Sequence, residues 1–346
     1  MLEIGSIVDG KYRILSKVGQ GGMSTVYLAI NEKANKPWAI KEVRKDGIQN
    51  FEVVRQSLIV ETDLLKKLKH DNLPSIIDII DQDDNFLIVM DYIEGITLDK
   101  VIKEYGPQKQ DDVVNWAIQL CDVLCYLHTR KPPIIYRDMK PSNVMLKYDG
   151  SVVLIDFGTA REYKERASGD TACLGTQGYA APEQFGGQGQ TDARTDIYCL
   201  GATMYHLLTG HNPSEPPYEM YPITYWDASL SSGLEGIILK CTQKNPEDRY
   251  QTAEELMYAL QNYRDLDAPM IRKYKHRVIS FATSAALAVL CGVMAVTMHV
   301  SARGQQKSEY AYLIDAAQKA SSQEDKKAYY LEAINTCLLY TSPSPR

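Results

Sequence analysis

The sequence predicts an α+β fold in which a mostly β segment precedes a mostly helical one. Between residues 12 and 93, short alternating segments rich in β-branched and aromatic residues are bounded by Gly, Asn and Asp, a pattern typical of strands. From Thr97 onward, apolar residues recur at helical spacing. Residues 278–300 differ from both parts, because they contain no Asp, Glu, Lys or Arg. We therefore expect a small β-rich lobe, a larger α-rich lobe and one apolar helix.

The individual elements follow from these patterns. The expected strands are residues 11–18, 25–30, 38–43 and 86–92. A helix is expected between the third and fourth strands, because Val54, Leu58, Leu65 and Leu68 fall on one helical face. The main helices of the second lobe are expected at residues 113–128, 196–209, 234–243 and 253–263.

Composition limits the classes of function. The chain of 346 residues has a formal net charge of −6, so it lacks the basic footprint of a nucleic-acid-binding protein. Its seven cysteines are scattered without metal-ligand spacing or a disulfide framework, which suits a reducing compartment. Residues 1–10 have no basic start and no apolar run, so no secretory signal is expected there.

The apolar stretch 278–300 is long enough to cross a membrane. As a helix it would span about 34 Å, against a hydrocarbon core of about 30 Å. Four cations between Arg272 and Arg277 precede it, whereas only Arg303 and Lys307 follow it closely. This bias predicts a single-pass protein with residues 1–277 in the cytoplasm. A buried core helix is the alternative, but a core helix rarely lacks every charge over this length.

Residues 301–336 are expected to form an extracytoplasmic helical segment. Residues 328–334 are weakly similar to the second helix of a tetratricopeptide repeat, and a single repeat would need neighbours to cover its apolar face. Residues 337–346 resemble a translated sequencing adapter rather than natural coding sequence. If so, the natural protein continues past Thr336.

A glycine-rich run lies between the first two expected strands. Gly19, Gly21 and Gly22 would let the backbone approach phosphate oxygens closely, which side chains would prevent. Alone this is a weak signal, because glycine-rich hairpin turns are common. Ser24 also occupies the position of the third glycine in the usual phosphate-binding pattern.

Lys41 ends an apolar strand and has a candidate partner in Glu61. A lysine at such a place is usually solvated. However, Glu61 lies on the apolar stripe of the following helix, and a carboxylate that faces a core needs a cation. We expect a Lys41–Glu61 ion pair that holds the lysine against phosphates.

The strongest signal is a cluster of polar residues between positions 136 and 158. Phosphoryl transfer needs a base, a cation on the transferred group, and oxygen ligands for Mg²⁺. Asp138, Lys140, Asn143 and Asp156 supply this set, and Asp156 ends an apolar strand. Each could be an ordinary turn residue, but their joint occurrence by chance is very unlikely.

From about residue 12 to residue 266 the chain resembles the eukaryotic-like (Hanks-type) Ser/Thr protein kinases of bacteria. The resemblance rests on Tyr136-Arg137-Asp138-Met139-Lys140-Pro141-Ser142-Asn143, on Asp156-Phe157-Gly158 and on Ala181-Pro182-Glu183. It implies a two-lobed protein kinase fold around an ATP cleft, with Mg²⁺ or Mn²⁺ as the metal cofactor. Protein substrates are also implied.

The resemblance assigns roles residue by residue. Asp138 would be the catalytic base, Lys140 the cation on the γ-phosphate, and Asn143 and Asp156 the Mg²⁺ ligands. Lys41 and Glu61 would form the activating pair, and Met90 would precede a hinge at Asp91–Ile93. Glu183 would pair with Arg249, and Asp196 would brace the catalytic loop. The implied ATP-binding residues are Val18, Gly19, Gln20, Gly21, Gly22, Met23, Ser24, Thr25, Val26, Ala39, Lys41, Glu61, Met90, Asp91, Ile93 and Met145.

Substrate class and regulation follow from the same resemblance. Lys140, two residues after the base, and Thr176 match Ser/Thr-type enzymes. Arg137 would bind a phosphate on the activation segment, with Thr171 as the first expected phosphosite and Ser168 as the second. Tyr136 replaces the usual histidine, a position that supports the backbone near Phe157, so we expect little loss of activity.

Three other functions share part of this pattern. A pseudokinase scaffold would lack Lys41, Asp138 or Asp156, and all three are present. A receptor whose outer part does the essential work is compatible with catalysis, since clustering as a homodimer would promote phosphorylation between copies. A small-molecule phosphotransferase is disfavoured by the complete segment from Asp156 to Glu183.

The expected organisation is therefore a kinase domain at residues 12–266, with lobes 12–91 and 95–266. A basic linker at 267–277, a membrane helix at 278–300 and the outer segment at 301–336 follow it.

Overall fold

A computed structural model describes residues 1–20, 24–44, 62, 66–81, 85–157, 161–162, 175–185 and 190–341. It divides into two compact units, Met1–Met270 and Ile271–Arg346. The expected residues Gly21, Gly22, Met23, Glu61, Gly158, Ser168 and Thr171 lie outside the described residues, as do Val54, Leu58 and Leu65.

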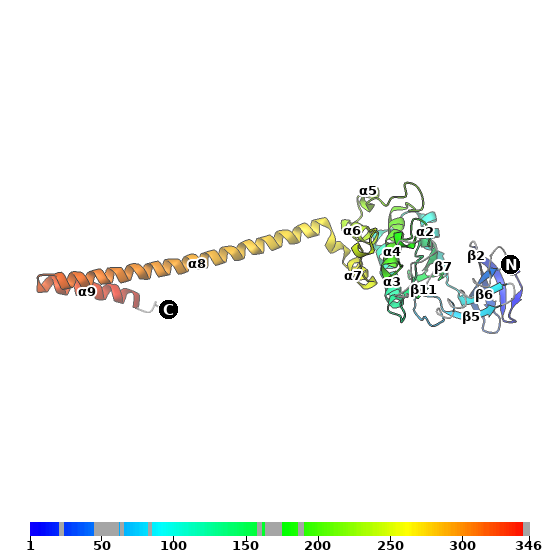
Figure 1. Cartoon of the computed structure of the whole chain (residues 1–346), viewed down its shortest axis with the longest axis horizontal. Helices are drawn as coiled ribbons and strands as arrows, with labels where there is room; N and C mark the ends of the chain where they lie inside the picture. The colour runs from blue at the N-terminus through cyan, green and yellow to red at the C-terminus, as the bar shows by residue number, and fades with distance from the viewer. Residues whose placement is uncertain are drawn as a thin grey trace. The chain divides into compact units, whose positions relative to one another are not determined.

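The first unit begins with a six-stranded antiparallel sheet (Figure 1). Its strand order is β1-β2-β3-β4-β6-β5. The strands are β1 (Ile7–Val8), β2 (Tyr12–Gln20), β3 (Ser24–Asn31), β4 (Lys36–Arg44), β5 (Ile76–Asp81) and β6 (Asn85–Asp91). Successive side chains of a strand point to opposite faces, which explains why buried and half-buried residues alternate along β3.

The two faces of this sheet have different roles. Ile14, Tyr27 and Ile40 are among the residues that form a buried core on one face. Ala39 and Lys41 point to the other face, because they flank Ile40 on β4. Lys41 pairs in register with Val26 of β3 and Ile88 of β6, which places its backbone in the middle of the sheet.

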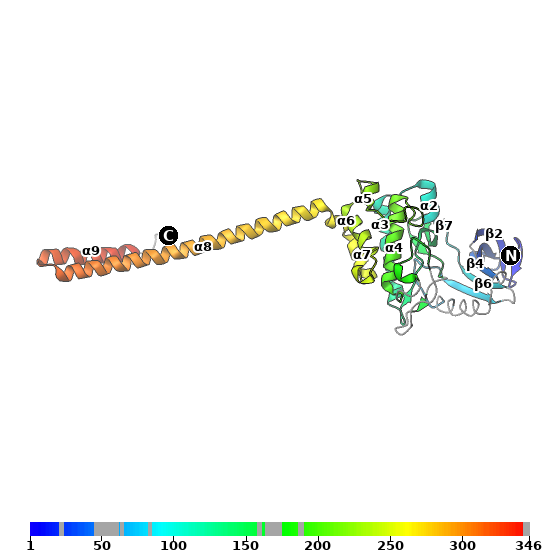
Figure 2. The ribbon, with the colours of Figure 1, turned by 45° about the horizontal axis from the view of Figure 1, so that its top comes forward.

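The rest of the first unit is mainly helical (Figure 2). Its helices are α2 (Leu98–Tyr105), α3 (Gln110–His128), α4 (Ala193–Thr209), α5 (Ile223–Trp226), α6 (Ser232–Cys241) and α7 (Ala253–Gln261). α4 begins at the N-cap Asp192, whose carboxylate accepts from Arg194 N, and it ends at Gly210 with a φ of 73°. Almost every residue of α4 is buried, so this helix forms the centre of the lobe.

Two small sheets carry the segments that face the first lobe. Strands β7 (Gly95–Thr97), β9 (Val144–Lys147) and β10 (Val152–Leu154) form one, in the order β10-β9-β7. β8 (Ile134–Ile135) and β11 (Arg161–Glu162) form the other. The segment with Asp138 and Asn143 lies between β8 and β9, and Asp156 follows β10.

The second unit is built from two long helices. α8 (Ala268–Lys319) runs without a break, and α9 (Gln323–Thr341) follows after three residues. Ser322 caps α9, because its hydroxyl accepts from Asp325 N at 3.1 Å. Leu313 and Ala317 of α8 and Ala333 of α9 are buried between these helices.

Within the described residues, α8 is the one helix that is long and apolar enough to cross a membrane. The candidate span runs over Lys275–Lys319, and none of its most apolar window is buried. The sequence prediction of an apolar helix after the two lobes is thus confirmed, although the helix extends well beyond residues 278–300.

The α+β, two-lobed prediction is also confirmed, with corrections to individual elements. β5 and the two small sheets were not predicted. Leu68 was placed in a helix, but it follows a turn at residues 66–67 and is buried outside any helix.

Candidate active site

A cleft of about 400 Å³ lies between the sheet and the helical lobe. Its walls come from β2, β3, β4 and β6 on one side and from β7, β9 and the segment after β10 on the other. The expected ligand-contacting residues that line it are Val18, Gly19, Gln20, Ser24, Val26, Ala39, Lys41, Met90, Asp91, Ile93, Asn143, Met145 and Asp156. Most of this wall is apolar, as suits a flat aromatic ligand.

Thr25 was expected to contact the ligand, but its side chain does not line the cleft. It is fully buried, because it points to the face of β3 opposite to Ser24 and Val26. Its hydroxyl has no hydrogen-bond partner among the described residues.

Lys41 and Asp156 form the ion pair at the inner end of the cleft. Lys41 Nζ lies 2.6 Å from Asp156 Oδ1, although the two residues are far apart in the sequence. Glu61, the partner expected for Lys41, lies outside the described residues. The ion pair therefore links Lys41 on the sheet to Asp156 in the helical lobe across the cleft.

Asp138, Lys140, Asn143 and Thr176 form a closed hydrogen-bonded cluster. Lys140 Nζ donates to Asp138 Oδ2 at 2.8 Å and to Thr176 Oγ1 at 2.6 Å. Thr176 Oγ1 in turn donates to Asp138 Oδ1 at 2.9 Å, and Asn143 Nδ2 donates to Asp138 Oδ2 at 2.9 Å. Both carboxylate oxygens of Asp138 are thereby held in place, next to a residue, Asn143, that lines the cleft.

The backbone that carries this cluster is constrained. Arg137 and Asp156 have φ values of 70° and 64°, in the left-handed region that non-glycine residues rarely adopt. Asp196, at 0% exposure, accepts from Tyr136 N at 2.9 Å and from Arg137 N at 2.6 Å. Its Oδ2 also lies 2.8 Å from His128 Nε2, a contact that the sequence did not indicate. The expected bracing role of Asp196 matches these bonds.

Tyr136 links the two functional segments. Its hydroxyl donates to Ile155 O at 2.5 Å, and its ring meets that of Phe157 edge-on at 5.2 Å. Burial raises the pKa of Tyr136 well above its usual value, and the nearby carboxylates of Asp156 and Asp138 add to this effect. The hydroxyl therefore stays a proton donor, and it fixes the carbonyl directly before Asp156.

The change Tyr136→Phe tests this link. The variant leaves the half-buried carbonyl of Ile155 without this donor, so the free energy of unfolding should fall by about 1 kcal/mol. Denaturant unfolding followed by tryptophan fluorescence measures this, because Trp38, Trp116 and Trp226 all lie in the first unit. Tyr105→Phe, at a tyrosine with 65% exposure, is the control that should change nothing. Equal stability of the two variants would contradict the role of the Tyr136 hydroxyl.

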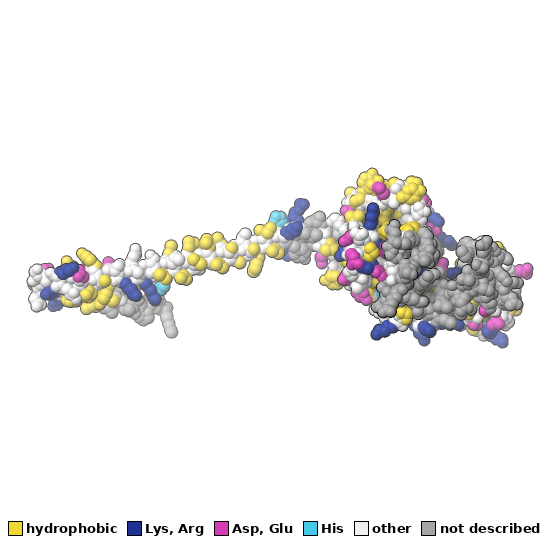
Figure 3. All heavy atoms as spheres, viewed as in Figure 1, with side chains coloured by type: hydrophobic (Ala, Val, Ile, Leu, Met, Phe, Trp, Pro, Cys, Tyr) yellow, Lys and Arg dark blue, Asp and Glu magenta, His cyan; other side chains and the backbone are white. Residues whose placement is uncertain are grey.

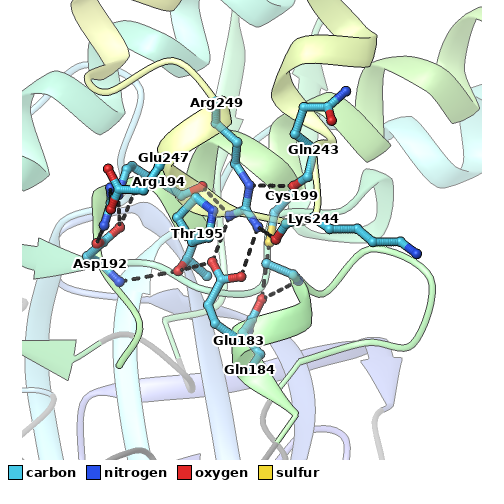
Figure 4. A network of polar contacts seen from close by, with 12 residues as sticks. Glu183, Gln184, Asp192, Arg194, Thr195, Cys199, Gln243, Lys244, Glu247 and Arg249 are labelled. Atoms are coloured by element: carbon cyan, nitrogen blue, oxygen red, sulfur yellow. Dashed lines mark hydrogen bonds and ion pairs between the residues drawn. The ribbon is translucent and has the colours of Figure 1, made fainter. Parts of the chain in front are cut away.

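A buried ion pair anchors the segment that follows Thr176 (Figure 4). Arg249 donates to both oxygens of Glu183, at 2.7 and 2.9 Å. Its remaining donors reach the backbone carbonyls of Gln243, Lys244 and Arg194 at 2.8–3.0 Å. All five donors of the guanidinium group are therefore used. The pairing expected between Glu183 and Arg249 is present.

Tyr179 ties the same segment to α4. Its hydroxyl lies 2.6 Å from Nδ1 of His206, which is 6% exposed. Burial lowers the pKa of His206 to about 4. Asp99 and Glu215 oppose this shift, whereas Lys103 and His211 add to it. The histidine is thus neutral at pH 7, and it shares one hydrogen bond with the hydroxyl of Tyr179.

This buried histidine predicts an acid-sensitive fold. Below its ordinary pKa of about 6.5, His206 takes up a proton in the unfolded chain, but the folded chain does not follow until about pH 4. Stability should therefore decrease as the pH falls from about 6.5 to 4, by up to about 3 kcal/mol from this group. Unfolding at pH 7 and at pH 4.5 should show a smaller pH dependence in His206→Gln than in the wild type. Parallel losses in both proteins would exclude His206 as the cause.

Several cleft residues were not predicted from the sequence. They are Pro74, Ile76, Ile88, Gly95, Ile96, Thr97, Lys100, Ser142, Ile155 and Phe157. Among these residues, Gly95 is the one whose type is restricted. A Cβ there would lie 2.2 Å from Leu146 O, so only glycine fits at this position. Ile96 and Thr97 reach the cleft because β7 pairs with β9, a long-range pairing that no local pattern indicates. The remaining residues come from β5, β6, α2 and the segments beside them.

A divalent cation fits the donor set at the inner end of the cleft. Asp156 offers carboxylate oxygens, and Asn143 keeps its amide oxygen available because its Nδ2 donates to Asp138. The described residues contain no group of three His, Cys, Asp or Glu side chains that would hold a metal by themselves. The arrangement therefore suits a Mg²⁺-type ion that is also bound by phosphate oxygens of a ligand.

Comparison with known proteins agrees with this geometry. Residues 12–260 match the family model described as the protein kinase domain. The chain is 33% identical, over 76% of its length, to the serine/threonine-protein kinase PrkC of Bacillus subtilis. It is 33% identical, over 75%, to the probable serine/threonine-protein kinase CPE1738 of Clostridium perfringens. It is 31% identical, over 72%, to the serine/threonine-protein kinase PknB of Mycobacterium tuberculosis.

These matches cover only part of the relatives. The aligned segment is 42% of the Bacillus protein, 39% of the Clostridium protein and 42% of the Mycobacterium protein. The chain thus spans about two fifths of the length of the curated relatives that it matches.

Proposed function

The chain belongs to the protein kinase family, and on that basis we propose that it transfers the γ-phosphate of ATP to Ser or Thr hydroxyls of proteins. The single observation that carries the proposal is the closed cluster of Asp138, Lys140, Asn143 and Thr176 beside the cleft. A pseudokinase scaffold is not favoured by any contact in the described part of the site. The proposed kinase domain covers residues 12–266.

Each described residue of the cluster has a task in the transfer. Asp138 accepts the proton of the attacking hydroxyl, and its carboxylate is aimed by Thr176 and Asn143. Lys140 lies against Asp138 and stabilises the negative charge on the transferred phosphoryl group. Thr176, which joins the base and the lysine, supports the Ser/Thr assignment.

Lys41 and Asp156 position the nucleotide. The adenine fits the apolar wall made by Val26, Ala39 and Met145, and Lys41 binds the α- and β-phosphates. When bound, Mg²⁺ or Mn²⁺ neutralises phosphate charge, held by Asp156 and Asn143. Glu61 would keep Lys41 in place, and Gly21, Gly22 and Met23 would cover the phosphates.

Regulation by autophosphorylation is part of the proposal. Arg137 is buried beside the base, with 1% exposure, and would bind a phosphate on Thr171 or Ser168. Two copies in a homodimer would phosphorylate each other.

We also propose that α8 crosses a cell membrane once, at residues 278–300. The cations at Arg272, Lys273, Lys275 and Arg277 favour a cytoplasmic kinase domain, with residues 301–336 on the other side.

Transfer of label tests the function directly. The full chain in detergent micelles is incubated with γ-labelled ATP and Mg²⁺, and the label is mapped by mass spectrometry. Label on Ser or Thr, absent from Lys41→Met, is the expected result. A folded chain that binds ATP and transfers no label to itself or to a basic protein would overturn the proposal.

A further inference from the structure

An exposed aromatic face lies on the loop between α4 and α6 and on α5. Tyr218, Tyr221 and Tyr225 are 60%, 38% and 70% exposed. Trp226 lies at their centre, with its ring edge-on to Tyr225 at 5.1 Å and stacked on His211 at 3.4 Å. The aromatic face consists of Pro216, Pro217, Tyr218, Tyr221, Pro222, Tyr225 and Trp226. Exposed apolar groups of this size mark interaction sites, and Tyr and Trp dominate binding energies at such sites.

The surroundings of the aromatic face are acidic. Glu215, Glu219 and Asp227 are exposed within or beside it, and the sequence has no Lys or Arg between Arg194 and Lys240. Figure 3 shows hydrophobic side chains over α5 with acidic side chains among them, and a basic side chain beside them. A partner with positive charge is therefore complementary to this surface.

A small cavity of about 80 Å³ adjoins the aromatic face. Glu215, Glu219, His211 and Trp226 are among the residues that line it. Asn212 Nδ2 donates to Glu215 at 3.2 Å, whereas Glu219 has no hydrogen-bond or ion-pair partner within the part of the chain that the structure describes. The size suits the head of one cationic side chain rather than a nucleotide.

The aromatic face is fixed to the segment that carries Thr176. The hydroxyl of Ser214 donates to the carbonyl of Gln177, and Tyr179 Oη lies 3.3 Å from Asn212 Oδ1. A Cβ on Gly178 would lie 2.5 Å from backbone atoms of Pro213 and Ser214, so the two segments are in close contact. A molecule held on the aromatic face is therefore held near the cluster around Asp138.

We propose that the aromatic face docks a basic segment of the protein substrate; this rests on the proposed kinase function. Arg and Lys side chains of the segment lie over the exposed rings and pair with Glu215 and Glu219. The segment is separate from the hydroxyl that is phosphorylated. Docking raises the concentration of that hydroxyl at Asp138 without a new contact at the catalytic cluster.

Steady-state kinetics of the full chain in detergent micelles test this. The probes are myelin basic protein as a basic substrate and dephosphorylated β-casein as an acidic one. We expect Tyr218→Ser/Tyr225→Ser to raise KM for the basic protein roughly tenfold, and Glu215→Gln/Glu219→Gln to raise it roughly fivefold. KM for casein and Kd for ATP should stay within twofold. Tyr258→Ser on α7, also 70% exposed, and Glu104→Gln are the matched controls.

The outcomes separate the two proposals. A wild type that phosphorylates neither protein nor itself overturns the proposed function. A wild type that is active, with variants whose KM for both proteins is unchanged, overturns the docking proposal alone. Light scattering tests whether a second copy of the chain occupies the aromatic face. A dimer in the wild type that the tyrosine variants lose would also overturn the docking proposal. Circular dichroism checks that each variant is folded.

Discussion

Replacement of Asp138 with Asn is expected to lower kcat for phosphoryl transfer about 10³-fold, within the range of roughly 10² to 10⁴ for a lost general base. The amide keeps the shape of the carboxylate, but it cannot accept the proton of the attacking hydroxyl. It also removes the negative charge that holds Lys140 Nζ at 2.8 Å. Both effects act in the transition state, so the loss should appear in kcat rather than in the binding of ATP.

Two measurements make this result specific. Kd for ATP, measured with a fluorescent analogue, should be unchanged within about twofold, because Asp138 does not line the cleft. Thr176→Ser keeps the hydroxyl that donates to Asp138 Oδ1 and should retain most activity, whereas Thr176→Val should not. A D138N protein with a kcat near that of the wild type would remove Asp138 from the role of base.

Replacement of Arg249 with Met should be the most destabilising single change in the first unit. It leaves the Glu183 carboxylate buried without its cation, and it removes the donor that Arg249 supplies to three backbone carbonyls. Removal of one partner of a buried pair costs about 3–5 kcal/mol. We expect the free energy of unfolding to fall by that amount, which is a large share of the roughly 5–15 kcal/mol that holds a domain folded.

A double-mutant cycle separates the ion pair from the other bonds of Arg249. Glu183→Gln should cost less, because Arg249 keeps its carbonyl acceptors. The double variant should be more stable than the sum of the two single losses predicts, since neither charge is then left unpaired. Arg249→Lys should not restore stability, because an ammonium group cannot reach five acceptors in the planar arrangement seen in Figure 4. Strict additivity would show that the pair itself contributes nothing.

The local patterns of the sequence predicted most of the strands and helices but not how they pair. Residues 25–30 and 38–43 were placed from alternation, and both lie inside longer strands, because hydrogen bonding continues past the last apolar side chain. β5 was missed, since its residues Ile76–Asp81 are half-buried and do not alternate cleanly. Alternation along β3 places Thr25 on the face turned away from the cleft, and a position in a glycine-rich run does not by itself predict contact with a ligand.

The site was predicted where chemistry restricts the residue type. Asp138, Lys140 and Asn143 lie within a few positions of each other, so a motif suffices to find them. Ile96 and Thr97 reach the cleft because β7 pairs with β9, a long-range pairing that one sequence does not encode in a local pattern. The aromatic face could not be predicted from the sequence for the same reason. The sequence contains its tyrosines, but only the fold determines that they are exposed on one surface.

The short segment between the first unit and residue 278 limits where the proposed kinase can work. The carboxylate of Asp267 is held by Ser231 and by Gly233 N, so the first unit is ordered up to this residue. Even a fully extended chain from Asp267 to Val278 spans no more than about 40 Å. If residues 278–300 lie in a membrane, the first unit therefore stays tethered close to the lipid surface. Substrates that diffuse laterally in the same membrane then meet it far more often than proteins in bulk solution, so encounter frequency would itself select among equally good phosphoacceptors.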